Sequence, residues 1–311
     1  MKMICTAAAL GALTLGLSYA CCRIGIRVPP RKEEDYFYMP STEQYEPYRE
    51  LSKRMIRATL DIPYEDVQTV SRDGLRLHAK LYAAADPKAP VQIMFHGYKS
   101  TAERDFCGGL RVAREKGYNV ILVDQRAHGK SEGKYLTFGI KERFDCLSWI
   151  DFAMLRFGSD AKIVLYGISM GAATVLMAAG EDLPDNVKGI VADCGYSSPK
   201  GIICSVLRAH HCPVFPIYPL ARLGARIFAG FDLEETSAAQ AMDKCLTPVL
   251  FVHGGDDRFV PCGMSEENYR RCKAENKRIL IVPGAGHGMS YMLDKPAYLK
   301  NLDEFLTSIG V

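Results

Sequence analysis

The sequence lacks the patterns that mark nucleotide and nucleic-acid binding. Its glycine-containing pentapeptide at residues 167–171 is neither a G-x-G-x-x-G fingerprint nor a P-loop, so no such cofactor is expected. The formal net charge is only +3, spread along 311 residues without a basic arm, which gives no case for nucleic-acid binding. Internal repeats and low-complexity tracts are also missing. With 48% hydrophobic residues, the chain can bury a sizeable core.

Cysteine spacing gives no sign of a disulfide framework. The eleven cysteines are an odd number, and several occupy positions where a small packed apolar residue would serve, which suits a reducing compartment. The adjacent His210, His211 and Cys212 do not have the spacing of a familiar ligand pair, so no metal is expected.

The first residues lack charge altogether. Residues 3–22 are rich in Ala, Leu and Gly, and twenty uncharged residues are about enough for one membrane span. We therefore expect residues 1–32 to be a membrane anchor. Basic residues are more numerous after the run, which favours a cytoplasmic location for the rest of the chain. The small residues Ser18 and Ala20 leave a cleaved secretion signal as the alternative.

Residues 33–65 are expected to form a charged linker and an amphipathic helix, and residues 66–311 a single domain. Asp73-Gly74 between two alternating runs predicts a hairpin, after which strands and helices alternate. This alternation predicts an α/β fold with a mostly parallel sheet covered by helices on both faces. The expected strands are 66–72, 75–82, 91–95, 119–123, 162–166, 189–192, 248–252 and 278–282, and the expected helices are 103–116, 141–157, 170–179, 264–276 and 297–308.

The pentapeptide Gly167-Ile168-Ser169-Met170-Gly171 is a G-x-S-x-G element between an apolar strand and a helix start. Such a turn lifts a serine hydroxyl above the edge of a sheet, and the flanking glycines permit the tight bend. Two further apolar strands end in Asp256-Asp257 and in His287. Serine, acid and histidine thus follow one another in the order of a nucleophilic triad, each after the carboxyl end of a strand.

Over residues 67–306 the chain resembles the alpha/beta-hydrolases, and more narrowly the bacterial esterase-like serine hydrolases with an N-terminal hydrophobic segment. The motifs that carry the resemblance are Phe95-His96-Gly97-Tyr98, Asp124-Gln125-Arg126-Ala127-His128-Gly129-Lys130-Ser131-Glu132-Gly133, the serine pentapeptide, and the 253–261 segment with the later His287. Ala127 departs from the usual glycine of the second motif. In this fold, an insertion such as residues 198–235 usually forms a cap, and its shortness would fit a preference for short acyl chains.

The resemblance implies roles for individual residues. Ser169 would be the nucleophile and His287 the base that takes its proton. The spacing H-G-x-x-D-x-x-V-P selects Asp257 over Asp256 as the residue that orients the imidazole. The backbone N–H groups of Tyr98 and Met170 would form the oxyanion hole.

The expected activity is hydrolysis of carboxylic esters or thioesters of small-molecule substrates through an acyl-enzyme. Two alternatives remain open. In an acyltransferase, an alcohol or thiol would replace water at the second step. A catalytically silent ligand-binding protein would share the fold alone, because a fold does not establish catalysis. The sequence leaves the oligomeric state open.

Overall fold

The computed structural model describes residues 2–30, 36–40 and 42–311 of the chain. At its centre lies one eight-stranded sheet in the order β1-β2-β4-β3-β5-β6-β7-β8. The pairs β1–β2 and β2–β4 are antiparallel, and the other neighbours run parallel. The strands are β1 (Glu65–Val70), β2 (Arg76–Tyr82), β3 (Val91–Phe95), β4 (Asn119–Asp124), β5 (Ile163–Ile168), β6 (Val187–Asp193), β7 (Val249–Gly254) and β8 (Lys277–Val282).

The eight expected strands are all present, each within two residues of its predicted ends. The predicted mostly parallel sheet with an antiparallel leading hairpin is confirmed. The helices of the described residues are α1 (Lys2–Gly25), η2 (Glu46–Tyr48), α2 (Arg49–Leu60), α3 (Ala102–Asp105), α4 (Gly109–Glu115), α5 (Glu142–Phe157), α6 (Met170–Ala178), α7 (Pro199–Ala209), α8 (Val214–Gly224), η3 (Ala225–Ala229), α9 (Ala238–Met242), α10 (Gly263–Arg271), α11 (Ser290–Leu293) and α12 (Lys295–Ser308).

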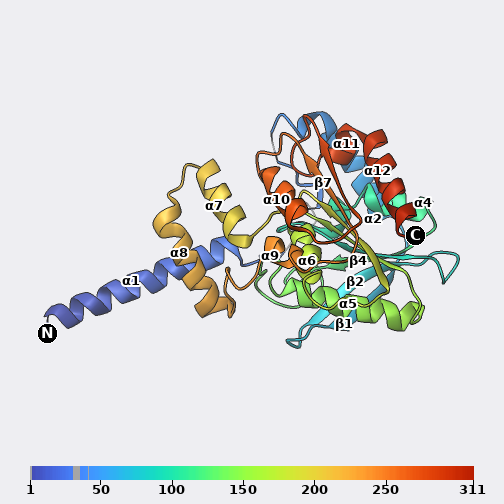
Figure 1. Ribbon diagram of the computed structural model, residues 1–311. Helices are drawn as coiled ribbons and strands as arrows, with labels where there is room; N and C mark the ends of the chain where they lie inside the picture. The colour runs from blue at the N-terminus through green and yellow to red at the C-terminus, as the bar shows by residue number, and fades with distance from the viewer. Residues whose placement is uncertain (1, 31–35, 41) are drawn as a thin grey trace.

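Helices cover both faces of the sheet (Figure 1). On one face α5 and α6 bury Trp149 and Leu176 in the larger apolar cluster, and on the other α4 and α12 bury Leu110 and Phe305 in a second cluster. Interior strands such as β4 are buried along their whole length. The sequences of these strands are continuous apolar runs because helices cover both faces of the sheet.

The predicted helix 103–116 is two helices, α3 and α4, separated by residues 106–108. Gly108 in this break packs so closely on the ring of Tyr291 that an added Cβ would lie 2.6 Å from it. The interruption therefore brings α4 against the segment that follows His287. Residues 106–108 of the break also line a cavity beside the sheet.

The N-terminal helix α1 is 24 residues long. In the part of the chain that the structure describes, no helix is both long and apolar enough to cross a membrane. The prediction of a membrane anchor in residues 1–32, and with it a membrane-anchored location, is therefore wrong. Missing charge does not by itself establish a membrane span, because a spanning helix must also be long and apolar enough over its whole length.

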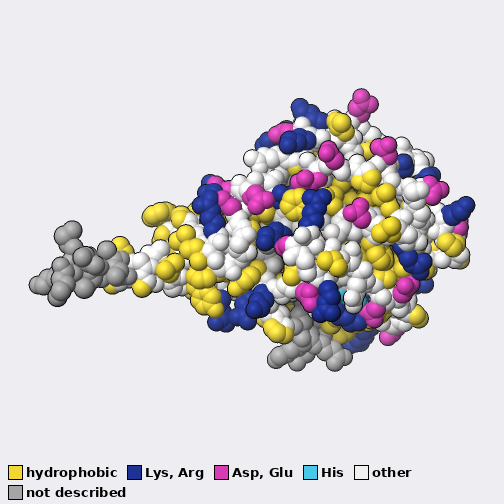
Figure 2. Space-filling model, turned by 90° about the horizontal axis from the view of Figure 1, so that it is seen from below, with side chains coloured by type: hydrophobic (Ala, Val, Ile, Leu, Met, Phe, Trp, Pro, Cys, Tyr) yellow, Lys and Arg dark blue, Asp and Glu magenta, His cyan; other side chains and the backbone are white. Residues whose placement is uncertain are grey.

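Helix α1 instead lies along α8, and together with α7 the two helices project to one side of the sheet domain (Figure 1). Ser18 and Cys22 of α1 are buried. Large apolar side chains nevertheless remain exposed on this projecting part, among them Leu13 and Phe215 (Figure 2). The division of the chain at residues 32 and 65 stays a prediction, as does the cap role of residues 198–235. Residues 31–35, at the junction of the expected anchor and linker, lie outside the described residues.

The end of α1 is tied to the loop that follows β3. The Tyr98 hydroxyl donates a hydrogen bond to the carbonyl oxygen of Gly25 (2.6 Å), and Lys99 Nζ donates to that of Ile24 (2.8 Å). Carbonyl groups in the last turn of a helix have no partner within the helix. Two side chains of the sheet domain therefore cap α1.

Candidate active site

Ser169 lies on a sharp turn between β5 and α6. Its backbone has φ 57° and ψ −114°, a strained conformation for a residue with a side chain, and its N–H donates to the carbonyl oxygen of Asp193 (2.8 Å). The turn is possible because its glycines approach other backbone closely. A Cβ on Gly167 would lie 2.2 Å from the oxygen of Gly171, and one on Gly171 would lie 1.8 Å from the oxygen of Phe95.

Gly171→Ala is accordingly expected to destabilise the fold by about 3 kcal/mol or more, because the methyl group would force β3 and α6 apart. Chemical denaturation followed by far-UV circular dichroism measures the change. Gly263→Ala is the matched control, since a Cβ at the start of α10 meets nothing within 4 Å. Equal denaturation midpoints for the two variants would contradict the close contact.

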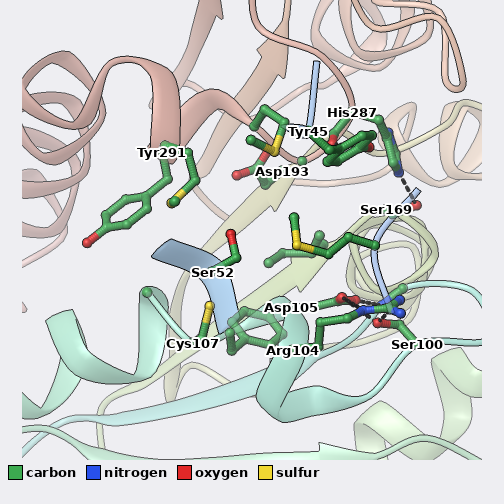
Figure 3. Close-up of a pocket in the computed structure, with 18 of the residues that line it drawn as sticks. Tyr45, Ser52, Ser100, Arg104, Asp105, Cys107, Ser169, Asp193, His287 and Tyr291 are labelled. Carbon is green, nitrogen blue, oxygen red and sulfur yellow. Dashed lines mark hydrogen bonds and ion pairs between the residues drawn. The ribbon is translucent and has the colours of Figure 1, made fainter. Parts of the chain in front are cut away.

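The structure brings the three predicted side chains together. His287 Nε2 lies 2.9 Å from Ser169 Oγ, and His287 Nδ1 lies 2.7 Å from Asp257 Oδ2 (Figure 3 for the serine and the histidine). The carboxylate can only accept at Nδ1, so Nδ1 carries the proton and Nε2 presents its lone pair to the serine hydroxyl. This is the arrangement that a base needs in order to take a proton from Ser169.

Asp257 is held in place on both sides. Its Oδ1 accepts hydrogen bonds from the backbone N–H groups of Phe259 and Val260, both at 2.8 Å. Nε2 of His253 faces two acceptors, Asp257 Oδ2 at 3.1 Å and the Val260 carbonyl, and so donates. Burial alone would raise the pKa of Asp257, but the charges and hydrogen bonds of His287 and His253 hold this pKa well below its usual range.

The neighbouring Asp256 does not share this position. Its side chain is exposed, and its carbonyl oxygen accepts a hydrogen bond from Gln44 Nε2 (3.0 Å). The carboxyl group at the imidazole is thus that of Asp257.

The predicted oxyanion donors flank the serine. The N–H of Met170 is the first of α6 and has no partner within that helix. In the loop after β3, the N–H of Gly97 donates to Asp105 Oδ2 (2.7 Å), which leaves the N–H of Tyr98 as the next donor along the loop. The Asp105 carboxylate also accepts from Ser100 and lies beside Arg104 (Figure 3).

The histidines near this loop brace it. His96 Nδ1 donates to the carbonyl oxygen of Gly97 (2.8 Å), and its Nε2 accepts from the N–H of Gln125 (3.2 Å). The ring of His128 packs edge-on against that of His96 and donates to the carbonyl oxygen of Arg126. Both side chains are buried, and they connect the β3 and β4 loops.

The N-terminal segment contributes to the site in a way that was not predicted from the sequence. The Tyr45 hydroxyl donates to the carbonyl oxygen of His287 (2.7 Å), and Gln44 holds the loop of Asp257. Only the helical spacing after residue 44 hinted that this segment docks on the domain, and it did not indicate where. Within α2, Ser52 and Ile56 are buried while Leu51 is exposed.

Asp193 at the end of β6 is a second carboxyl group beside the site (Figure 3). The Tyr298 hydroxyl donates to its Oδ2 (2.9 Å) and also contacts the Tyr166 hydroxyl. Burial raises the pKa of Asp193 to about 6 against the effect of the Tyr298 hydrogen bond. Its position after a buried strand was the available sequence signal.

A cavity of about 1100 Å³ opens beside Ser169 and His287 (Figure 3). It extends between the sheet and helices α4 and α12, and residues between Tyr38 and Ile56 line it on another side. Residues 198–235 contribute only Ala209 and His210 to its wall. The N-terminal segment therefore encloses this cavity more than the insertion does.

Comparison with known proteins agrees with this architecture. The family described as "alpha/beta hydrolase fold" matches residues 90–206. The uncharacterized protein YqkD of Bacillus subtilis is 31% identical over 195 residues, which are 62% of this chain and 64%, just under two thirds, of that protein. The thiohydrolase aneE of Aspergillus aculeatus is 29% identical over 134 residues, which are 42% of this chain and 41% of that protein.

Among solved structures, the Pyrococcus furiosus esterase Pf2001 superposes with a TM-score of 0.66 and 22% sequence identity, covering 91% of this chain and 98% of that one. This likeness concerns the fold. Together with the family match over the serine turn and the observed sheet, it shows that the chain has the alpha/beta-hydrolase fold.

Proposed function

We propose that the protein is a serine hydrolase that cleaves carboxylic esters or thioesters through an acyl-enzyme. The observation that carries the proposal is the line from Ser169 Oγ to His287 Nε2 and from His287 Nδ1 to Asp257, at 2.9 Å and 2.7 Å. An esterase with the same fold and a thiohydrolase relative support both classes of substrate.

In the proposed reaction, Ser169 Oγ forms a bond to the substrate carbonyl carbon while its proton passes to His287 Nε2. The carbonyl oxygen becomes an oxyanion, which accepts hydrogen bonds from the N–H groups of Met170 and Tyr98. Each such donor contributes about 3 kcal/mol to transition-state stabilisation. Collapse of this intermediate breaks the ester or thioester bond, and His287 returns the proton to the departing alcohol or thiol. Water then attacks the acyl-enzyme by the same steps and releases the acid.

A fluorophosphonate probe tests the proposal, because it forms a stable bond only with an activated serine. We expect stoichiometric labelling of the folded protein, with the adduct on Ser169 in peptide mass spectra and no labelling after denaturation. A folded protein that stays unlabelled would instead favour a ligand-binding role. Transfer to added alcohols or thiols, measured against hydrolysis, separates an acyltransferase from a hydrolase.

A further inference from the structure

We propose that the cavity beside Ser169 holds the acyl group of the substrate, and that this group is long and carries a hydrogen-bonding substituent such as a hydroxyl. The inference rests on the proposed function, since it places in the cavity the group that Ser169 would carry. It departs from the short-chain preference expected from residues 198–235, because those residues contribute little to the wall of the cavity.

The depth of the cavity sets the length of the group. Gln92 of β3 lines the cavity and pairs with Val164 of β5. Ser169 lies five residues beyond Val164 in the sequence, and at the strand rise this corresponds to about 16 Å. The volume of about 1100 Å³ is slightly larger than that of most ligand pockets. An acetyl or butyryl group would leave most of this space unfilled.

The walls of the cavity favour a hydrocarbon chain. Helices α4 and α12 contribute Val112, Leu299 and Leu302, and α2 contributes Met55 and Ile56. Each methylene group that leaves water for such a surface adds to binding. A longer chain therefore gains affinity until it reaches the far end of the cavity.

The order of events in the proposed reaction assigns the cavity to the acyl group. The leaving group departs first and needs a way out, whereas the acyl group stays attached to Ser169 until water attacks. Buried residues of α2 and α12, such as Ile56 and Leu302, line the cavity. A space enclosed by buried side chains suits the acyl group, which stays attached to Ser169.

Two buried polar side chains in the wall have no partner of their own. Ser52 is 7% exposed and Gln92 is 3% exposed, and neither side chain forms a hydrogen bond with any described residue. Figure 3 shows the Ser52 hydroxyl directed into the cavity. By contrast, Asp105 accepts hydrogen bonds from Gly97 and Ser100.

The unpartnered side chains of Ser52 and Gln92 favour a hydroxylated acyl chain over an unsubstituted one. A plain hydrocarbon chain would remove water from Ser52 and Gln92 and leave both without partners, which is unfavourable. A hydroxyl on the chain would restore a hydrogen bond, because a serine hydroxyl and a glutamine amide both donate and accept. The cavity therefore fits hydroxylated acyl groups better than unsubstituted ones.

Chain length is tested with para-nitrophenyl butyrate and laurate. We expect kcat/KM for laurate to exceed that for butyrate at least tenfold, and Leu299→Trp to lower this ratio at least tenfold by filling the cavity. Leu155→Trp is the matched control, because Leu155 is 89% exposed on α5, and it should leave the ratio unchanged. A butyrate preference, or a ratio that Leu299→Trp does not alter, would overturn the proposal. So would a preference for lauryl acetate, whose long chain is on the alcohol.

The substituent is tested with a set of positional hydroxylaurate esters. At least one should surpass laurate fivefold or more in kcat/KM, and Ser52→Ala or Gln92→Leu should reduce that advantage to twofold or less. Ser159→Ala, an exposed serine outside the cavity, should keep the advantage. The proposed hydroxyl substituent would be wrong if no hydroxylaurate surpassed laurate. It would also be wrong if both variants kept the preference for the hydroxylaurate ester.

Binding separates this inference from the proposed chemistry. Calorimetry on the Ser169→Ala protein with free hydroxylaurate requires no turnover. Binding that is lost on adding Leu299→Trp would support the cavity assignment even if the wild type hydrolysed no ester. Absence of binding would count against the cavity whatever the fluorophosphonate result, and circular dichroism verifies that each variant is folded.

Discussion

Ser169→Ala is expected to lower kcat for ester hydrolysis by about 10⁶-fold, with the fold intact. The methyl group cannot form the acyl-enzyme, and His287 then has no hydroxyl proton to take. The remaining rate over the uncatalysed reaction would come from substrate binding and from the N–H groups of Met170 and Tyr98. Active-site titration must accompany the kinetics, because a trace of wild-type protein would hide a loss of this size.

The matched control for this loss is Ser159→Ala, on the exposed turn after α5. It should keep kcat within twofold of the wild type. If the Ser169→Ala protein retained more than about one hundredth of wild-type kcat, another nucleophile would have to be sought and the proposed mechanism would fail.

Asp257→Asn is expected to lower kcat by about 10⁴-fold. An asparagine at this position can present its amide N–H to His287 Nδ1, which favours the tautomer whose Nε2 carries the proton. That tautomer cannot accept the proton of Ser169. The variant also loses the negative charge that stabilises the imidazolium formed during the reaction.

The same substitution should move the acid limb of the pH profile. Burial lowers the pKa of His287, but the charge and hydrogen bond of Asp257 raise it more, so that the pKa lies above the ordinary histidine value. Because the proposed base must be neutral, wild-type kcat/KM should fall as pH decreases through this raised pKa. Removing the charge lowers the pKa, and the residual activity of Asp257→Asn should persist to lower pH.

Asp256→Asn provides the matched control one residue away. The Asp256 side chain is exposed, and its hydrogen bond to Gln44 uses the backbone carbonyl. We therefore expect kcat within twofold of the wild type and an unchanged acid limb. Equal losses in the two variants would mean that the loop as a whole, rather than the Asp257 carboxylate, supports His287.

The sheet and the three polar side chains were predictable because each leaves a local signal. Apolar runs separated by helical spacing define the strands, and Ser169, Asp257 and His287 each follow such a run. In a parallel sheet the carboxyl ends of the strands lie at one edge, so residues far apart in sequence meet there without any information on pairing.

Other parts of the site leave no such signal. The contact of Tyr45 with His287 spans 242 residues, and nothing in the sequence around either residue specifies it. The break between α3 and α4 contains Gly108, which packs against Tyr291, a residue distant in the sequence that no local pattern connects with it. The membrane anchor was inferred from the length, missing charge and Ala, Leu and Gly content of residues 3–22, and these features did not suffice to predict a helix that crosses a membrane.

The capping of α1 by Tyr98 and Lys99 has a consequence for the proposed chemistry. Tyr98 carries a backbone amide that would steady the reacting oxygen, and its own side chain is anchored to the end of α1. A shift of α1 relative to the sheet would therefore pull on the loop that sets the direction of this amide. Tyr98 thus links the projecting helices to the proposed catalytic geometry, because its side chain contacts α1 and its backbone lies in the loop beside Ser169.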